Sequence, residues 1–427
     1  MLNRIVAPDF QSIKPLNLIQ PDSVRYDNGL QAFVFQDPQL QLLRFEFVFK
    51  NIFDKQEFPL RNTIMSSMLR EGTATLSSAE IADQVDFYGA YLMPEYSLDH
   101  TSLTVYTMHK YVDRILPIIL DILNNSIFPQ KELDTFVRNN KQTLQISLKK
   151  NDVLARRLFF QTVFGDNRYG SIPTAEAYDS VNRGDLLQLF GQQVQPQNCT
   201  LFVAGHVDAD VLRMMREYFG EQWKGKATLP AENVPELGNV KEQIIVEKRE
   251  EALQSAIRMG NLTLNRSNPD FPAVQFVNTL LGGFFGSRLM RNIREDKGYT
   301  YSIGSAVSSL QYTGLFTLSS EVGVDVTGAT ISEIKKEFEK LRQEQAGQEE
   351  VELVRNYLQG VMLGSLESVF SHVDKFKAVY FSGLDLSYYA YYSDVIAHMT
   401  VVQVQDTAIR YFDYDSLVKV VVGKMGE

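Results

Sequence analysis

Two polar side chains near residue 300, Arg294 and Tyr301, are of types that can act on a reacting carbonyl group. An arginine presents a fixed set of donors that suits a carbonyl or carboxylate oxygen. A tyrosine hydroxyl can donate to an oxyanion as it develops. The two residues stand seven positions apart in the stretch LLGGFFGSRLMRNIREDKGYTYSIGS, residues 280–305. One Arg and one Tyr near a turn are common in proteins, so the pair gains meaning only from the rest of the chain.

The same stretch predicts the elements that position the pair. Two adjacent glycines end one helix, and a turn with a further glycine separates a second helix from a strand. Arg294 then closes the second helix and Tyr301 lies in the strand. The expected elements are a helix at Phe271–Leu281, a break at Gly282–Gly283, a helix at Ser287–Arg294, a turn at Asp296–Gly298 and a strand at Tyr299–Ser305.

The composition limits the classes of protein to which this chain can belong. A chain of 427 residues predicts two or three domains, and 44% hydrophobic with 22% charged residues is typical of a globular protein. The net charge of −10 argues against a nucleic-acid partner or an anionic membrane surface. A single cysteine, Cys199, excludes an intramolecular disulfide framework and a cysteine-rich zinc site.

The sequence also allows an expectation about where the protein is located. The N-terminal stretch lacks the apolar segment of a signal peptide. No run approaches the ~20 apolar residues that a membrane-spanning helix needs. We expect a cytoplasmic protein, or a periplasmic one if a leader has been removed.

The two halves of the chain repeat the same order of expected strands and helices. Val137-Arg138-Asn139 recurs as Val354-Arg355-Asn356, 217 positions later. The strand that ends at Gly205 recurs as the strand that ends at Gly423, 218 positions later. We therefore infer an internal duplication.

The duplication sets the expected domains and fold class. The domains are residues 1–225 and 244–427, and a polar, proline-containing linker joins them at 226–243. Hairpins followed by runs of helices predict an α+β fold. Each domain would have a largely antiparallel sheet with helices packed on one face. The linker permits the two domains to face each other as a clamshell.

The sequence offers few other chemical motifs. No histidine has another at the spacing of a zinc-binding helix, so scattered structural histidines are the favoured interpretation. The histidines are His100, His109, His206, His372 and His398. The glycines at 282, 283 and 286 follow an expected helix rather than a strand, which favours close packing over a dinucleotide-binding loop.

The stretch at 280–305 closely resembles the C-terminal half of the pitrilysin/insulinase family of zinc peptidases, which includes the mitochondrial and the bacterial two-subunit processing peptidases. In the first half, FPLRNTIMSSMLREGTATLSSAEIADQVDFYGA, residues 58–90, is similar to the family stretch that normally carries H-x-x-E-H. The likeness extends over nearly the whole chain. It implies a duplicated α+β fold and a peptide substrate.

The chain departs from the family at the catalytic positions. Counting back from Gly72-Thr73, the two zinc histidines fall on Thr63 and Ser67, and the general-base glutamate falls on Ser66. The third ligand, a glutamate, falls at about Gln145. Thr, Ser and Gln are poor zinc ligands, and a serine hydroxyl does not take a proton from water near neutral pH as a carboxylate can. We expect this chain to bind no catalytic zinc and to hydrolyse no peptide alone.

Arg294 and Tyr301 match the family's C-terminal pair, which the resemblance implies binds substrate and stabilises the tetrahedral intermediate. In bacterial two-subunit members one chain carries the zinc motif and its partner carries this pair, and the present sequence resembles that partner. The corresponding turn of the first half, around Val85 to Leu92, has neither an Arg nor a Tyr at those places. The repeat alone therefore does not account for the pair, although a vestigial pair kept by packing stays an alternative.

Two functions remain open at this point. The first is a zinc-less subunit that forms a dimer with an H-x-x-E-H peptidase subunit, offers a sheet edge to an extended peptide and lends Arg294 and Tyr301 to the partner's site. Zinc is then expected only in the partner. The second is a catalytically dead homologue that acts in assembly or peptide binding, including as a homodimer. A self-sufficient metallopeptidase is the least favoured reading.

Overall fold

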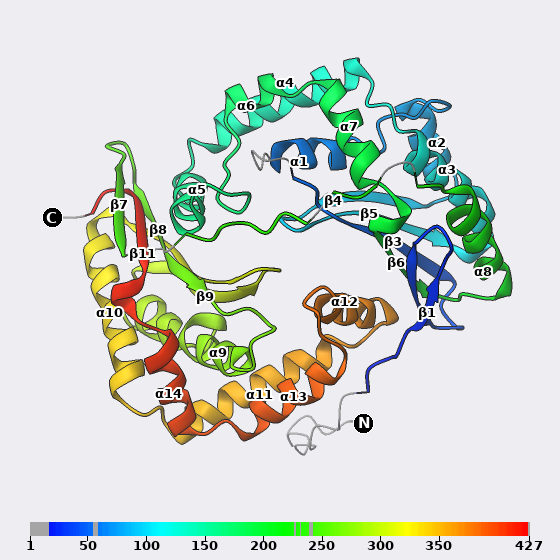
Figure 1. Cartoon of the computed structure of the whole chain (residues 1–427). Helices are drawn as coiled ribbons and strands as arrows, with labels where there is room; N and C mark the ends of the chain where they lie inside the picture. Colours follow the sequence, from blue (N-terminus) through cyan, green and yellow to red (C-terminus); the bar gives the residue numbers. More distant parts are fainter. Residues whose placement is uncertain (1–16, 54–58, 226–227, 231, 239–241, 426–427) are drawn as a thin grey trace, which may run out of the picture.

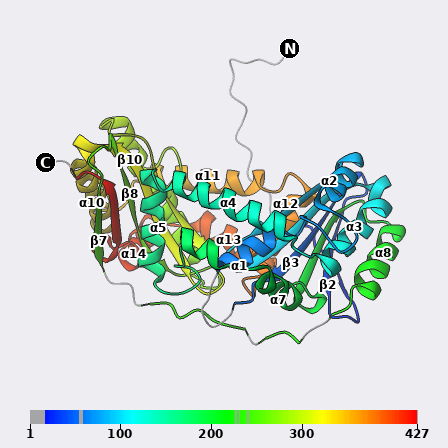
Figure 2. The same ribbon diagram turned by 90° about the horizontal axis from the view of Figure 1, so that it is seen from above.

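The computed structural model describes residues 17–53, 59–225, 228–230, 232–238 and 242–425. Part of the expected linker, at 226–227, 231 and 239–241, lies outside the described residues. The chain forms a curved molecule with one β-sheet at each end, and long helices connect the two ends (Figure 1). The second view shows α4 and α11 running lengthwise between the sheets (Figure 2).

The first half contributes six strands and eight α-helices to the described structure. The strands are β1 (Asp22–Arg25), β2 (Gln31–Gln36), β3 (Leu42–Lys50), β4 (Tyr91–Tyr96), β5 (His100–Met108) and β6 (Cys199–Gly205). The helices are α1 (Pro59–Ser67), α2 (Ser78–Phe87), α3 (Val112–Asn125), α4 (Gln130–Ser147), α5 (Asn151–Phe164), α6 (Ala175–Ser180), α7 (Arg183–Gln193) and α8 (Ala209–Met215), with a π-helical turn, η3, at Arg216–Gln222.

The second half contributes five strands and six α-helices to the described structure. The strands are β7 (Gln243–Lys248), β8 (Gln254–Thr263), β9 (Thr300–Ser309), β10 (Gly314–Gly323) and β11 (Val418–Gly423). The helices are α9 (Phe271–Asn278), α10 (Thr327–Gln343), α11 (Gln348–Gly364), α12 (Val369–Tyr380), α13 (Ser387–His398) and α14 (Val401–Tyr411), with two π-helical turns, η4 (Thr279–Gly283) and η5 (Met290–Asp296).

The sheet topology agrees with the inferred duplication. The first sheet has the order β1-β2-β6-β3-β5-β4 and the second has β7-β11-β8-β10-β9, so they match strand for strand once β1 is set aside. Each has one parallel pair, β2 with β6 and β7 with β11, and is otherwise antiparallel. The two strands noted for their spacing end alike, because Gly205 (φ 121°) and Gly423 (φ 137°) both adopt the left-handed region that favours glycine. The α+β class with two related sheets is confirmed.

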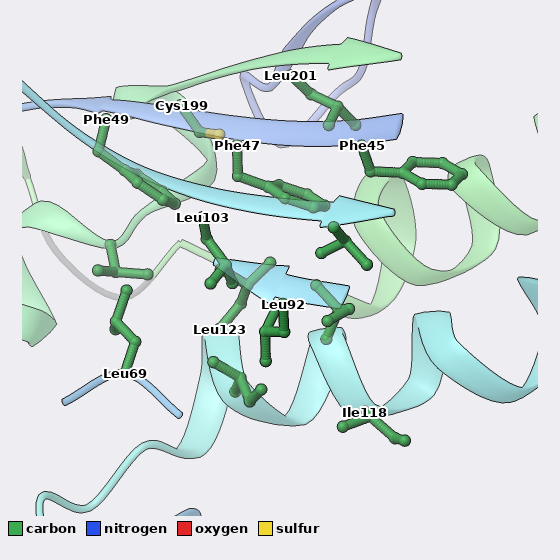
Figure 3. Packing of buried hydrophobic residues seen from close by; sticks show 14 of the residues in the cluster. Phe45, Phe47, Phe49, Leu69, Leu92, Leu103, Ile118, Leu123, Cys199 and Leu201 are labelled. Atoms are coloured by element: carbon green, nitrogen blue, oxygen red, sulfur yellow. The ribbon is translucent and has the colours of Figure 1, made fainter. Parts of the chain in front are cut away.

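The helices of each half cover one face of its own sheet, as expected. In the first half, aromatic residues of β3 and aliphatic residues of β4, β5 and α3 form a continuous apolar core (Figure 3). Phe45, Phe47 and Phe49 alternate along β3 and are fully buried, which is the period-two pattern of a strand with one face toward a core. Cys199 is buried in this core as a free thiol.

The opposite face of each sheet is covered by a helix from the other half, which the sequence pattern did not predict. Helix α12 packs on β6 and β2 of the first sheet, where Phe376 lies among Phe35 and Phe202. Helix α5 packs on β8 and β11 of the second sheet, where Phe159 lies among Val418 and Val420. The two halves therefore exchange helices, and each completes the core of the other.

Charged groups also join the halves. The Arg44 guanidinium on β3 lies 2.5 Å from Glu46 and 2.7 Å from Asp374 of α12, and Lys377 lies 2.5 Å from Glu46. Burial lowers the pKa of Arg44, but the hydrogen bond to Asp374 and the charge of Glu46 outweigh it, so the pKa of Arg44 is raised. Breaking such a buried network by removing one partner is costly.

Several elements escaped the sequence analysis. These are β1, β7, α6, α12, α13 and α14. Helices α12 and α13 are rich in aromatic residues and pack against more than one neighbour, so their apolar residues do not follow a single stripe. By contrast, the S-S-A-E sequence at Ser77–Glu80 is typical of a capping box, and the structure has one: Glu80 N donates to the Ser77 hydroxyl at 3.3 Å, and Ser77 N donates to the Glu80 carboxylate at 2.8 Å.

Within the described residues, no helix combines the length and the apolar character needed to cross a membrane.

Candidate functional site

The structure brings Arg294 and Tyr301 together at the surface of the second half. The Arg294 guanidinium carbon lies 5.8 Å from the centre of the Tyr301 ring and 4.6 Å from that of Phe285. Tyr301 is 89% exposed and Phe285 is 62% exposed. The guanidinium is thus held beside two aromatic rings, an arrangement worth about 0.5–1 kcal/mol at an exposed site. We call these three residues the Arg–Tyr cluster.

A π-helical turn places Arg294. The expected helix at Ser287–Arg294 continues as η5 to Asp296, and Tyr299 N donates to the Ile293 carbonyl at 3.0 Å to close the turn. Gly298, at φ 68°, then reverses the chain into β9. A π-turn inserts one residue relative to an α-helix and so changes which side chains face outward.

Ionic and amide contacts anchor this segment to two helices. Arg288 makes a bidentate pair with Glu350 at the start of α11, with both N–O distances 2.8 Å. The amide of Asn292 donates to Glu337 at 2.7 Å and to Glu333 at 3.1 Å, both on α10. Bidentate arginine–carboxylate pairs fix geometry as well as adding energy. The helix that carries Arg294 is therefore held from two sides.

The glycine pair permits close approach, as the sequence suggested. A Cβ atom at Gly282 would lie 2.5 Å from the Ser305 hydroxyl and 2.9 Å from the Ser305 nitrogen. Only glycine lets η4 pack this closely on β9. The loop between Gly283 and Ser287 then carries Phe285, which the sequence analysis passed over. The sequence signal for Phe285 was an aromatic residue between glycines, in a loop where it is not part of the hydrophobic core.

Strand β9 is the outermost strand of the second sheet, and its counterpart β4 is the outermost strand of the first. The edge of β4 is partly blocked, because Pro94 lacks an N–H group and the Arg70 guanidinium donates to the Leu92 carbonyl at 3.3 Å. Proline and charged side chains on an edge strand oppose the addition of a further strand. Strand β9 contains no proline and begins beside Tyr301.

The four degenerate positions do not form a metal site. Thr63, Ser66 and Ser67 lie on α1. The Thr63 hydroxyl donates to the Pro59 carbonyl at 3.1 Å, and the Ser67 hydroxyl donates to the Thr63 carbonyl at 2.9 Å. Both hydroxyls thus serve their own helix. The Ser66 hydroxyl is fully buried without a hydrogen-bond partner.

Gln145 lies on a different helix from these three residues. It is exposed on α4 and lines a hollow of about 640 Å³ with Tyr178 and Asp179, and no residue of α1 lines that hollow. The chemistry of this donor set does not fit zinc, since alcohols and amides are weak ligands for that ion. Within the described part of the chain, no group of three His, Cys, Asp or Glu side chains is placed to hold a metal ion.

Comparison with known proteins indicates a peptidase-like fold. A model of the family described as peptidase M16 inactive domain matches residues 180–358. The chain is 24% identical over 314 residues to an uncharacterized zinc protease of Bacillus subtilis (YmxG), covering 73% of this chain and 75% of the relative. It is 24% identical over 349 residues to an uncharacterized zinc protease of Rickettsia bellii, covering 80% and 83%.

Solved structures show the same fold. A peptidase M16 inactive domain from Pseudomonas fluorescens superposes with a TM-score of 0.86 at 19% identity, covering 95% of this chain and 98% of the other. A protease from Helicobacter pylori gives a TM-score of 0.85 at 17% identity, covering 95% and 100%. Residues 180–358 thus match a peptidase M16 inactive domain, and the similarity of the longer chain to zinc proteases agrees with the resemblance to the pitrilysin/insulinase family.

Proposed function

We propose that this chain is the non-catalytic subunit of a two-subunit metallopeptidase. It binds an extended peptide together with an H-x-x-E-H subunit and supplies Arg294 and Tyr301 to the active site of that subunit. The observation that carries the proposal is the exposure of the pair. Tyr301 is 89% exposed and Arg294 half-buried, so neither holds the core together.

The chemistry follows from the side chains. The Arg294 guanidinium, steadied against Phe285, can donate to a peptide carbonyl, and the Tyr301 hydroxyl can donate to the oxyanion that forms when that carbonyl is attacked. The partner would supply the metal-bound water and the general base. No step of hydrolysis is assigned to Thr63, Ser66, Ser67 or Gln145, since their side chains do not suit it.

The two sheet edges suggest where the peptide lies. The outer edge of β9 can pair with an extended backbone, and a peptide there would pass beside Tyr301. The corresponding edge of β4 is obstructed at Leu92 and Pro94. The proposed peptide therefore runs along β9, between this chain and its partner.

A stripe of exposed apolar residues on α11 supports an association with another subunit. Leu353, Tyr357 and Val361 recur every four residues and are 42%, 39% and 50% exposed. The Tyr357 ring lies 4.7 Å from that of Phe284, so the stripe continues into the loop that carries Phe285. A helix face of this kind is usual where a second protein packs. The same stripe would serve the alternative function, a purely assembling or homodimeric homologue.

The test is a rate comparison in the reconstituted complex. The chain is purified with an H-x-x-E-H protein encoded beside it, and kcat/KM for peptide hydrolysis is measured for the native chain, Arg294→Ala and Tyr301→Phe. Loss of one oxyanion donor typically costs about 10²–10³ in rate, and a loss of this size is expected for Tyr301→Phe. The matched control is Tyr91→Phe, which removes an exposed tyrosine hydroxyl from β4 and should leave the rate unchanged.

Unchanged rates in both Arg294→Ala and Tyr301→Phe, with complex formation intact, would refute the shared site and favour the assembly role. Zinc bound in stoichiometric amount by this chain alone would overturn the assignment at Thr63–Ser67. Size-exclusion chromatography with light scattering, with and without the partner, separates a homodimer from a heterodimer.

A further inference from the structure

Four helices and a loop of the second half line a hollow that does not include Arg294. Residues of α9, α11, α12 and α13, together with Arg266 from the loop after β8, line a volume of about 420 Å³. Helix α12 lies next to α11 and α13 in Figure 1. We call this volume the tyrosine hollow, after Tyr388, Tyr389 and Tyr392 of α13, which line it.

Two cations line the tyrosine hollow without a matching carboxylate. Arg266 and Lys375 are both half-buried, and neither takes part in an ion pair within the described structure. The Arg266 guanidinium donates to the Ala378 carbonyl at 2.9 Å. The one carboxylate in the lining, Asp374, is engaged by Arg44 at 2.7 Å and Lys377 at 3.4 Å. The hollow thus carries an excess of positive charge in a chain whose net charge is −10.

A buried tyrosine, Tyr388, belongs to the lining of the same volume. Tyr388 is 9% exposed, and its hydroxyl has no hydrogen-bond partner of good geometry among the described residues, although Arg266 is close enough to interact with it. Its ring centre lies 6.0 Å from the Arg266 guanidinium carbon. Burial raises the pKa of Tyr388 to about 12, against the opposing effect of Arg266, so the hydroxyl stays a proton donor. A buried donor without an acceptor costs about 1–3 kcal/mol, and native proteins keep few of them.

Lys375 is also a polar group in an unfavourable environment. Burial and the charge of Arg266 lower the pKa of Lys375, because two like charges are held together away from water. An anion between Lys375 and Arg266 would offset both effects. The remaining lining combines apolar and aromatic side chains, including Leu358, Met362 and Tyr392, with the polar side chains of Gln275, Ser365 and Ser371.

We propose that the tyrosine hollow binds an organic carboxylate with an apolar body. Lys375 and Arg266 pair with the carboxylate, the Tyr388 hydroxyl donates to it, and the apolar body lies against α11 and Tyr392. A peptide that ends in a hydrophobic residue and a free small acid share this chemistry. The site is independent of the proposed subunit role, and its test uses the isolated chain, so either can fail without the other.

Binding is measured by isothermal titration with the native chain and four probes. These are N-acetyl-phenylalanine, its amide, a short peptide ending in phenylalanine, and the same peptide amidated at its C-terminus. Both acids are expected to bind more tightly than their amides by at least about tenfold, since hydrogen bonds to charged groups are worth ~1.5–3 kcal/mol. Tight binding of the peptide acid alone identifies a peptide C-terminus as the ligand, and equal binding of both acids identifies a small-acid site.

Three variants locate the binding. Lys375→Met and Tyr388→Phe should each weaken acid binding by about tenfold or more, while Lys131→Met, at an exposed lysine of α4, should not change it. Without ligand, Lys375→Met and Tyr388→Phe should raise the melting temperature, because each removes a poorly compensated polar group. A lowered melting temperature in both would indicate that the groups serve the fold. That result, equal affinity for acids and amides, or no binding of any probe would overturn the proposal.

Discussion

The two halves of the molecule contain equivalent turns whose side chains have different roles. In the first half α2 leads through Gly89, at φ 61°, into the edge strand β4. In the second, η5 leads through Gly298, at φ 68°, into the edge strand β9. The backbone device is the same, and the strands that follow hold equivalent places in the two sheets.

The side chains on the two turns differ in what they serve. Four residues before and three after the first glycine stand Val85 and Leu92, which are 6% and 5% exposed and belong to the core. At the same distances from the second glycine stand Arg294 and Tyr301, which lie at the surface. Packing therefore accounts for the pair in the first half but not for the pair in the second. This contrast argues against a vestigial pair kept only by the fold.

Alanine at the two equivalent positions tests the contrast directly and should show the largest effect. Leu92→Ala removes a buried side chain and is expected to lower the free energy of unfolding by about 2–5 kcal/mol. Tyr301→Ala removes an exposed one and should stay within about 0.5 kcal/mol of the native chain. Urea denaturation followed by circular dichroism measures both. A large loss for Tyr301→Ala would assign that residue to the fold and erase the difference between the halves.

The burial of His100 at the junction of the halves leads to a second prediction, which concerns pH and has a smaller expected effect. His100 lies against Phe381 of the second half, with ring centres 4.1 Å apart. Burial, then the charges of Lys50 and Lys377, lower the pKa of His100 from 6.5 to about 4. Between pH 6.5 and pH 4, His100 binds a proton in the unfolded chain but not in the folded chain. The free energy of unfolding should therefore fall as the pH drops from 6.5 toward 4. The loss amounts to at most about 3 kcal/mol.

The matched variant is His100→Gln, in which this part of the pH dependence should vanish while stability at pH 7.5 changes little. Denaturation midpoints for both proteins at several pH values provide the measurement. An unchanged slope in His100→Gln would show that other groups account for the acid sensitivity.

The smallest expected effect concerns Ser66, where the resemblance predicts the position of the family's general base. Ser66→Ala removes a buried hydroxyl without a partner and should stabilise the chain by about 1 kcal/mol. Ser67→Ala, the control, removes a hydroxyl that already donates to the Thr63 carbonyl and should change stability by less than about 0.5 kcal/mol. Thermal unfolding resolves the two. Reduced peptidase activity of the complex with Ser66→Ala would instead indicate that α1 contributes to the active site.

Much of the local structure was predictable from the sequence. The capping box at Ser77 and the glycine turn at Gly298 are short-range signals, since hydrogen bonding and φ angles depend on a few neighbouring residues. The alternating strand at β3 is equally local. The outcome at Gly282 was also foreseen, because a glycine without a turn role indicates close packing.

The parts that were missed depend on long-range contacts. Helix α12 meets the first sheet through Phe376, and nothing near residue 376 in the sequence indicates which sheet it will cover. Phe285 was passed over because its role comes from Arg294, nine positions later and across a π-turn. The tyrosine hollow combines Arg266 with Lys375 and Tyr388, which lie more than a hundred residues away along the chain.

The sequence by itself determined the duplicated α+β architecture, because the repeat and the apolar patterns depend on residue type and spacing. Its resemblance to a zinc-peptidase family predicted that Thr63, Ser67 and Gln145 stand where that family has zinc ligands. It also singled out Arg294 and Tyr301 as candidates. Only the tertiary structure decided that these two side chains meet at the surface while Val85 and Leu92 are buried, and that each sheet borrows a helix from the other half. The physical reason is that burial and contact depend on which distant segments pack together, which no local pattern encodes.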